Sequence, residues 1–174
     1  MKQLRAILAA HSAEDLGVSW TAQRMASSWY ILALLFVAVA ITQCNIWDFA
    51  RMIKKVTRKS ALSYIAYGCY CGYGGSGQPK DLTDWCCHKH DCCYDHLDQI
   101  GCHPMFKSYK FEFVNEIMCE HDEDDYCASK TCECDRETAL CFKANRATYS
   151  YKYFLYMKKV MCKDPAVHCS MYTF

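Results

Sequence analysis

The sequence predicts a mainly α-helical, disulfide-rich domain, and three observations carry this prediction. Segments 45–60, 83–101 and 132–149 have the apolar spacing, the capping residues or the length of helices. Cysteine accounts for 15 of 174 residues, a content typical of secreted disulfide scaffolds. Five glycines crowd the stretch from Gly68 to Gly77, which therefore reads as a loop with unusual backbone angles.

Residues 1–44 are expected to be a leader with a signal peptide, followed by a secreted domain over 45–174. The apolar run WYILALLFVAVAIT (29–42) suits the h-region of a signal peptide. It falls short of the roughly 20 residues that a transmembrane helix needs, although a signal anchor remains the alternative. Cleavage after Cys44 would leave an even number of cysteines. The length of the upstream part leaves both Met1 and Met25 open as the start.

The overall charge is close to balance, with 20 Lys and Arg against 19 Asp and Glu. A nucleic-acid-binding protein would show a strong basic excess, so this class is excluded. The same balance argues against a strong preference for anionic membranes.

Segment 45–60 is expected to form an amphipathic helix. Ile46, Phe49, Ile53 and Val56 fall on one face at helical spacing. The opposite side carries the basic residues Arg51, Lys54, Lys55, Arg58 and Lys59. Trp47 lies with these cations, which fits either an interfacial membrane contact or an ordinary solvated face. Asp48 adds an acidic residue next to Trp47, close to this possible membrane contact.

The remaining elements follow from local signals. A helix starts near the capping pair Thr83-Asp84 and ends at Gly101. Residues 107–113 alternate and predict a short strand, with a hairpin return near 117–119. The acidic run 120–125 predicts an exposed turn, and 132–149 predicts a second long helix. The tail has no clean period and is expected to be tied down by its two last cysteines.

The stretch WCCHKHDCCYDH (85–96) carries the chemistry. On a helix, His90 and Tyr94 share a face, and Asp91 flanks them. Zinc is disfavoured because the adjacent cysteine pairs point in divergent directions and secretion favours disulfides. A glycine-rich loop of carbonyls followed by a helical aspartate suggests a calcium site instead. The patterns of an EF-hand and of a phosphate loop are both missing.

Two segments together carry a family resemblance. YGCYCGYGGSGQPKDLTDWCCHKHDCCYDH resembles the calcium loop and active-site helix of secreted phospholipases A2, and CECDRETALCF resembles their second catalytic helix. The similarity spans essentially all of 45–174, and the cysteine count and extended tail look like the group II type. The resemblance implies two long antiparallel helices linked by disulfides, an N-terminal helix, a calcium loop and a small antiparallel β-wing.

The same resemblance implies an activity: secreted, calcium-dependent hydrolysis of the sn-2 ester of glycerophospholipids at membrane surfaces. His90 would be the general base that activates a water, and Asp135 would orient its imidazole. Tyr94 and Tyr109 would hydrogen-bond Asp135. An imidazole backed by a carboxylate is a usable base near neutral pH, which agrees with these roles.

Calcium would be held by the carbonyl oxygens of Tyr70, Gly72 and Gly74 and by the carboxylate of Asp91. The ion, with the N–H of Gly72, would stabilise the oxyanion. At the surface, Ile46, Phe49 and Ile53 would line the lipid channel, while Trp47, Tyr73 and nearby lysines would face the membrane.

The resemblance also implies seven disulfides and a monomer acting peripherally on membranes. His88 and His96 receive no role and are expected to be solvated. The expected pairs are Cys69–Cys162, Cys71–Cys87, Cys86–Cys141, Cys92–Cys169, Cys93–Cys134, Cys102–Cys127 and Cys119–Cys132.

The rival reading is a non-catalytic secreted protein on the same scaffold, such as a receptor ligand or matrix protein. A growth-factor-like ligand is a third reading, but it would not explain the ordered His-Asp and Cys-Asp pairs. Relatives without activity typically lose the histidine or the calcium aspartate, and both residues are present here.

Overall fold

A computed structural model describes residues 29–31 and 46–174, and the chain divides into two units, Met1–Gln43 and Cys44–Phe174. The expected leader, except for three helical residues, and its cleavage point lie outside the described residues. None of the helices in the described ranges has the length and apolar character to cross a membrane.

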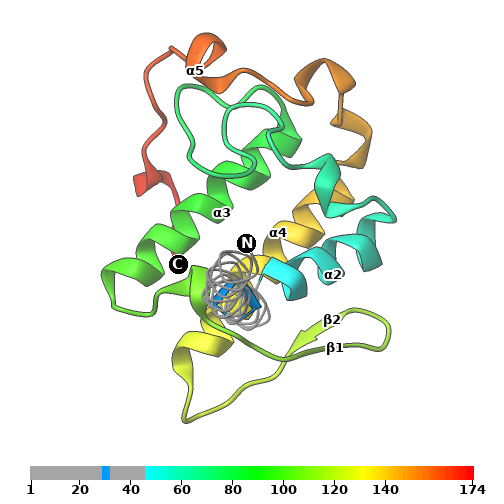
Figure 1. The fold of residues 1–174 in the computed structure, drawn as a ribbon, viewed down its shortest axis with the longest axis vertical. Helices are drawn as coiled ribbons and strands as arrows, with labels where there is room; N and C mark the ends of the chain where they lie inside the picture. Colours follow the sequence, from blue (N-terminus) through cyan, green and yellow to red (C-terminus); the bar gives the residue numbers. More distant parts are fainter. Residues whose placement is uncertain (1–28, 32–45) are drawn as a thin grey trace, which may run out of the picture. The chain divides into compact units, whose positions relative to one another are not determined.

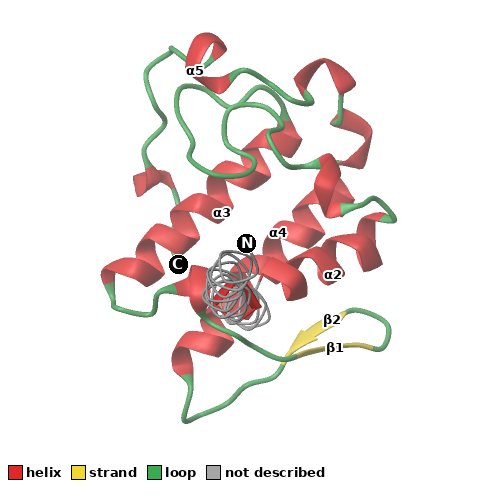
Figure 2. Cartoon of the chain, viewed as in Figure 1, coloured by secondary structure: helices red, strands yellow, loops and turns green. Residues whose placement is uncertain are grey.

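Residues 46–174 form a mainly helical unit with a small antiparallel sheet (Figures 1 and 2). Helix α3 packs along α4, and α2 packs against α4 from another side. Strands β1 and β2 pair with Phe111 opposite Cys119. The helices and strands are α2 (Ile46–Thr57), α3 (Leu82–Gln99), β1 (Phe111–Phe113), β2 (Ile117–Cys119), α4 (Tyr126–Ala144) and α5 (Lys158–Met161). The expected fold class is confirmed.

All seven expected disulfides are formed among the described residues. Cys86–Cys141 and Cys93–Cys134 both join α3 to α4. Their order increases along α3 and decreases along α4, so the two helices run antiparallel, as expected. The remaining pairs are Cys69–Cys162, Cys71–Cys87, Cys92–Cys169, Cys102–Cys127 and Cys119–Cys132.

The ends of the two long helices differ from the sequence-based expectation. The N-cap of α3 is Asp81, whose side chain accepts a hydrogen bond from Asp84 N at 2.9 Å. The expected cap at Thr83-Asp84 was therefore wrong, because both residues already lie inside the first turn. Helix α4 begins at Tyr126, capped by Asp125, six residues before the expected start, and ends at Ala144 instead of 149. The acidic turn supplies the cap.

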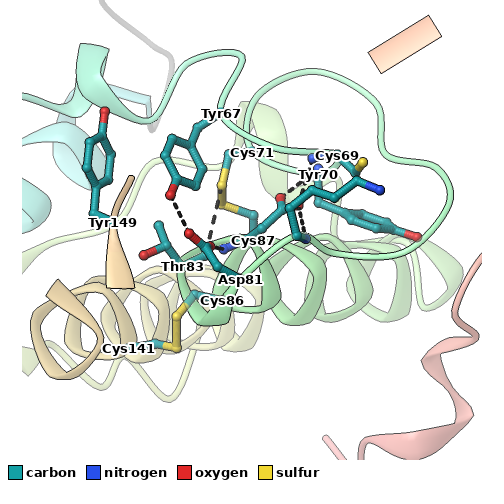
Figure 3. Close-up of a disulfide and its surroundings, with 12 residues drawn as sticks. Tyr67, Cys69, Tyr70, Cys71, Asp81, Thr83, Cys86, Cys87, Cys141 and Tyr149 are labelled. Atoms are coloured by element: carbon teal, nitrogen blue, oxygen red, sulfur yellow. Dashed lines mark hydrogen bonds between the residues drawn. A yellow bond between two sulfur atoms is a disulfide. The ribbon is translucent and has the colours of Figure 1, made fainter. Parts of the chain in front are cut away.

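Aromatic stacking forms much of the core. The Tyr64 ring stacks on Phe142 with centroids 4.1 Å apart, and Tyr67 stacks on Tyr149 at 4.6 Å. The hydroxyl of Tyr67 also donates to Asp81, at the start of α3 (Figure 3). From α2 the fully buried Met52 enters this core, although it lies beside the apolar stripe that the sequence singled out.

A buried carboxylate fixes the glycine-rich loop to α3. Asp84 has no exposed surface and accepts hydrogen bonds from the backbone N–H of Cys69, Tyr70 and Lys80 at 2.7, 2.8 and 2.9 Å. Gly68 has φ of 57°, and a Cβ there would lie 2.3 Å from this carboxylate. Only glycine fits at that position. The Cys71–Cys87 disulfide adds a covalent link between the loop and the same helix (Figure 3).

The C-terminal tail is held against α3 by His88. The expectation that His88 is solvated was wrong, because its exposure is only 1%. Its Nε2–H donates to the carbonyl of Val167 at 3.1 Å, so its Nδ1 accepts from the Tyr172 hydroxyl at 2.9 Å. His96, in contrast, is exposed. The tail thus folds back onto α3 and brings Val167 and Tyr172 into contact with His88, from which they are distant in the sequence.

Replacing Asp84 with asparagine should destabilise the unit. The amide would turn one acceptor oxygen into an NH₂ group that faces backbone N–H donors, at a cost of about 2–3 kcal/mol. Guanidinium unfolding with the disulfides intact measures this change.

Asp95→Asn is the matched control, because Asp95 is exposed on the same helix and carries the same charge. Its free energy of unfolding should change by less than about 0.5 kcal/mol. Equal stabilities of the two variants would contradict the role given to Asp84.

Candidate active site

The centre of the site is a histidine from α3 that faces a buried aspartate from α4. His90 Nε2 lies 2.6 Å from Asp135 Oδ1. Asp135 has no exposed surface, and 14% of the His90 side chain is exposed. A carboxylate only accepts hydrogen bonds, so Nε2 carries the proton and Nδ1 is left with a free lone pair. The pair is therefore oriented to accept a proton at Nδ1.

Two tyrosines hold the aspartate in place. Tyr94 donates its hydroxyl to Asp135 Oδ1 at 2.9 Å, and Tyr109 donates to Oδ2 at 2.5 Å. Burial, followed by the charge of Asp135, raises the pKa of the Tyr109 hydroxyl far above its usual value. Tyr109 thus remains a donor throughout the usual pH range. The structure brings together all four residues that the resemblance singled out for this position.

Helix α2 covers the imidazole. The Phe49 ring stacks on His90 with centroids 4.7 Å apart and planes 15° from parallel. Ile53 is buried one turn further on, whereas Ile46 is 59% exposed. Of the three predicted channel residues, Phe49 therefore contacts the dyad, Ile53 is buried and Ile46 is mostly exposed.

Asp48 lies close enough to Asp135 for the charge of one carboxylate to act on the other. Burial raises the pKa of the Asp48 carboxyl, the nearby Arg51 lowers it, and the charge of Asp135 raises it again. Its carboxylate pairs with Arg51 at 3.0 Å. No sequence pattern indicated an electrostatic interaction between Asp48 and Asp135.

The glycine-rich loop is fixed in place beside α3. Disulfides fix it at two points, Cys71–Cys87 to α3 and Cys69–Cys162 to the tail. Within the loop the Tyr70 hydroxyl donates to Gly77 O at 2.8 Å. Gly72 has φ of 91°, which residues with a side chain rarely adopt. The loop conformation is thus set by covalent and hydrogen-bonded supports.

The main-chain carbonyl oxygens of this loop are ligands that suit a hard cation. Lys158 Nζ donates to Gly74 O at 2.7 Å and to Tyr73 O at 3.5 Å, so a positive charge already sits on one of the predicted calcium ligands. The positive charge of Lys158 also acts on the carboxylate of Asp91. Burial raises the pKa of Asp91 to about 7, while His90 and Lys158 act to lower it.

The metal chemistry that these residues offer is that of calcium. In the described ranges no three His, Cys, Asp or Glu side chains gather closely enough to hold a metal ion. A cation here would depend on backbone carbonyls and one carboxylate, and calcium accepts this mixture of oxygen ligands. Tyr70, Gly72, Gly74 and Asp91 therefore fit the ion that the resemblance implies.

Several apolar side chains of α2, of the turn that follows it and of the glycine-rich loop are exposed. Trp47 is 58% exposed and Tyr73 is 95% exposed. Leu62 and Ile65, which follow α2, are also exposed. Sequence reasoning identified Trp47 and Tyr73 but missed the other two, because they belong to a short turn without periodicity.

Comparison with known proteins agrees with this geometry. The phospholipase A2 family model matches residues 46–154. Human group IIE secretory phospholipase A2 is 46% identical over 141 residues, which cover 80% of this chain and 97% of that protein. The acidic phospholipase A2 VP8 of Daboia palaestinae is 48% identical over 72% of this chain and 90% of its own length. Rat group IIC secretory phospholipase A2 is 41% identical over 79% and 95%.

The matched residues 46–154 include α2, α3, α4, the glycine-rich loop and the His90–Asp135 dyad, and the seven disulfides agree with the pairing expected for the group II type. The chain therefore belongs to the phospholipase A2 family and is an enzyme of its group II type.

Proposed function

We propose that the protein is a secreted, calcium-dependent enzyme that hydrolyses the sn-2 ester of glycerophospholipids at membrane surfaces. The products are a free fatty acid and a lysophospholipid. The observation that carries this proposal is the 2.6 Å hydrogen bond from His90 Nε2 to a fully buried Asp135 carboxylate. It leaves Nδ1 as the base.

His90 acts as base and then as acid. Its Nδ1 takes a proton from a water while the oxygen of that water attacks the sn-2 carbonyl carbon. The imidazolium formed is stabilised by Asp135, which Tyr94 and Tyr109 keep in position. Nδ1–H then donates its proton to the departing glycerol oxygen as the ester C–O bond breaks. Since water is the nucleophile, no acyl-enzyme forms.

Calcium would be held by the carbonyl oxygens of Tyr70, Gly72 and Gly74 and by the carboxylate of Asp91. When bound, the ion supplies Lewis-acid polarisation of the ester carbonyl and stabilises the oxyanion. The N–H of Gly72 is a second donor to the same oxygen. Asp84 and the Cys71–Cys87 disulfide keep the loop at a fixed place on α3.

The route to the cell exterior follows from the cysteines. Seven disulfides persist only in an oxidising compartment. We assign residues 1–44 to a leader whose apolar run at 29–42 directs secretion and whose removal leaves residues 45–174 as the enzyme. Human and rat relatives are named secretory phospholipases A2.

The membrane-binding surface includes exposed aromatic residues of α2 and of the loop, Trp47 and Tyr73. The exposed cations of α2, such as Lys54 and Lys55, lie on the neighbouring face. Aromatic residues flanked by cations suit the interface between headgroups and acyl chains. The enzyme would thus bind as a peripheral monomer.

The test of the activity is fatty-acid release from phosphatidylcholine and phosphatidylglycerol vesicles, with calcium and with chelator. Protein purified after expression of the full chain in eukaryotic cells should release sn-2 fatty acid only with calcium. His90→Gln should lower the rate by at least about 10³-fold, because the base is lost.

His96→Gln is the matched control. His96 lies on the same helix but is exposed, and it should retain the full rate. A correctly disulfide-bonded protein that binds calcium but releases no fatty acid would instead support the rival, a non-catalytic binding protein on this scaffold.

A second prediction concerns membrane binding. Trp47→Ala should weaken partition into phosphatidylcholine vesicles about tenfold, because a half-exposed indole contributes a large apolar area at the interface. Vesicle sedimentation measures the partition directly.

Tyr126→Ala is its control, since Tyr126 is 56% exposed, nearly as much as Trp47, but lies beside the acidic turn. Its partition should be unchanged. Equal losses for the two variants would show that the rim of α2 is not the membrane surface.

A further inference from the structure

Lys158 places a cation inside the loop where calcium is proposed to bind. Its Nζ donates to Gly74 O at 2.7 Å, and Gly74 O is one of the proposed calcium ligands. Lys158 also acts on Asp91, since each of the two charges shifts the pKa of the other. One ammonium therefore interacts with both kinds of donor, carbonyl and carboxylate, that the metal would use.

The backbone around Lys158 is tied to the loop at several points. Lys158 begins the short helix α5, and the disulfide Cys69–Cys162 joins the residue after that helix to the loop. Ser76 Oγ donates to Cys162 O at 3.4 Å, and Tyr156 N donates to Ala66 O at 2.8 Å. These links hold the start of α5 beside the loop. The backbone of Lys158 is therefore held where its side chain can contact Gly74.

Two cations cannot share these donors without a cost. The Gly74 oxygen that accepts from Nζ at 2.7 Å would coordinate calcium at about 2.3–2.6 Å. A divalent ion and an ammonium at this separation repel one another strongly in a partly buried site. Calcium binding therefore requires the Lys158 side chain to swing away from Gly74 and Asp91.

We propose that Lys158 competes with calcium for the Gly74 oxygen and for the field of Asp91, and so sets the calcium concentration that the enzyme needs. This inference rests on the calcium site of the proposed function. Calcium binds when its concentration is high enough to displace the ammonium. Lys158 is a residue that regulates the metal site, and it takes no part in the proton transfers at His90.

Direct calcium binding tests the inference without reference to catalysis. Isothermal titration of calcium chloride into the purified protein, at physiological ionic strength, gives the Kd. Lys158→Gln should lower the Kd about tenfold, because the repelling charge is removed from the immediate surroundings of the ion. Lys159→Gln removes the same charge from the exposed next residue of α5 and should leave the Kd within about twofold, since screening weakens distant charges.

Each outcome decides a separate point. A Kd for Lys158→Gln that equals or exceeds the wild-type value would overturn the competition while leaving the calcium site intact. An equal decrease in both lysine variants would also overturn it, because the effect would then be one of net charge alone. Absence of calcium binding in the wild type and in Lys158→Gln would overturn the calcium part of the proposed function, and this inference with it.

Discussion

The fixed pairing of α3 with α4 is the constraint on which the rest of the site depends. His90 lies between Cys86 and Cys93 on one helix, and Asp135 lies between Cys134 and Cys141 on the other. The disulfides Cys86–Cys141 and Cys93–Cys134 therefore bracket the dyad on both sides. A slip of one helix along the other would part Nε2 from the carboxylate, and the two covalent bonds prevent such a slip. The two disulfides thus help to keep His90 Nε2 within hydrogen-bonding distance of Asp135.

The glycine-rich loop, where calcium is proposed to bind, is attached to the same helix. Asp84 binds three backbone N–H groups at the two ends of the loop, and Cys87 joins it covalently to α3. His90, the proposed base, and Asp91, the proposed calcium ligand, follow on α3 within two turns of Asp84. Helix α3 thus positions the residues for both parts of the proposed chemistry, proton transfer and charge stabilisation. The tail adds a further support, since His88 and Cys92 fasten it to the same helix.

The sequence predicted those parts of the molecule whose signal lies in residue type and spacing. The motif around His90, the second motif around Asp135 and the glycine-rich loop pointed to their partners through a family resemblance. The burial of His88 could not be read in this way, because Val167 and Tyr172 lie about 80 residues away and reach it only after the tail folds back. Tertiary contacts of this kind leave no local pattern.

Other features were hidden for different physical reasons. Asp84 binds main-chain N–H groups, which every residue but proline carries, so no partner stands out in the sequence. The start of α4 lies in a stretch of charges and cysteines that has no apolar period, and its cap Asp125 resembled one more acid of an exposed turn. Lys158 looked like one lysine among several in an irregular tail. Its contact with Gly74 depends on a disulfide that joins segments 93 residues apart.

The role proposed for His90 is tested most directly by determining which of its ring nitrogens carries the proton. In protein labelled with ¹⁵N-histidine, the chemical shifts and long-range couplings of the ring nitrogens distinguish a protonated nitrogen from an unprotonated one, and the spectrum of His90→Gln assigns the signals. At a pH where the ring is neutral, we expect a proton on Nε2, hydrogen-bonded to Asp135, and no proton on Nδ1. A proton on Nδ1 with a bare Nε2 would contradict the account, because the nitrogen assigned to take the proton from water would already hold one.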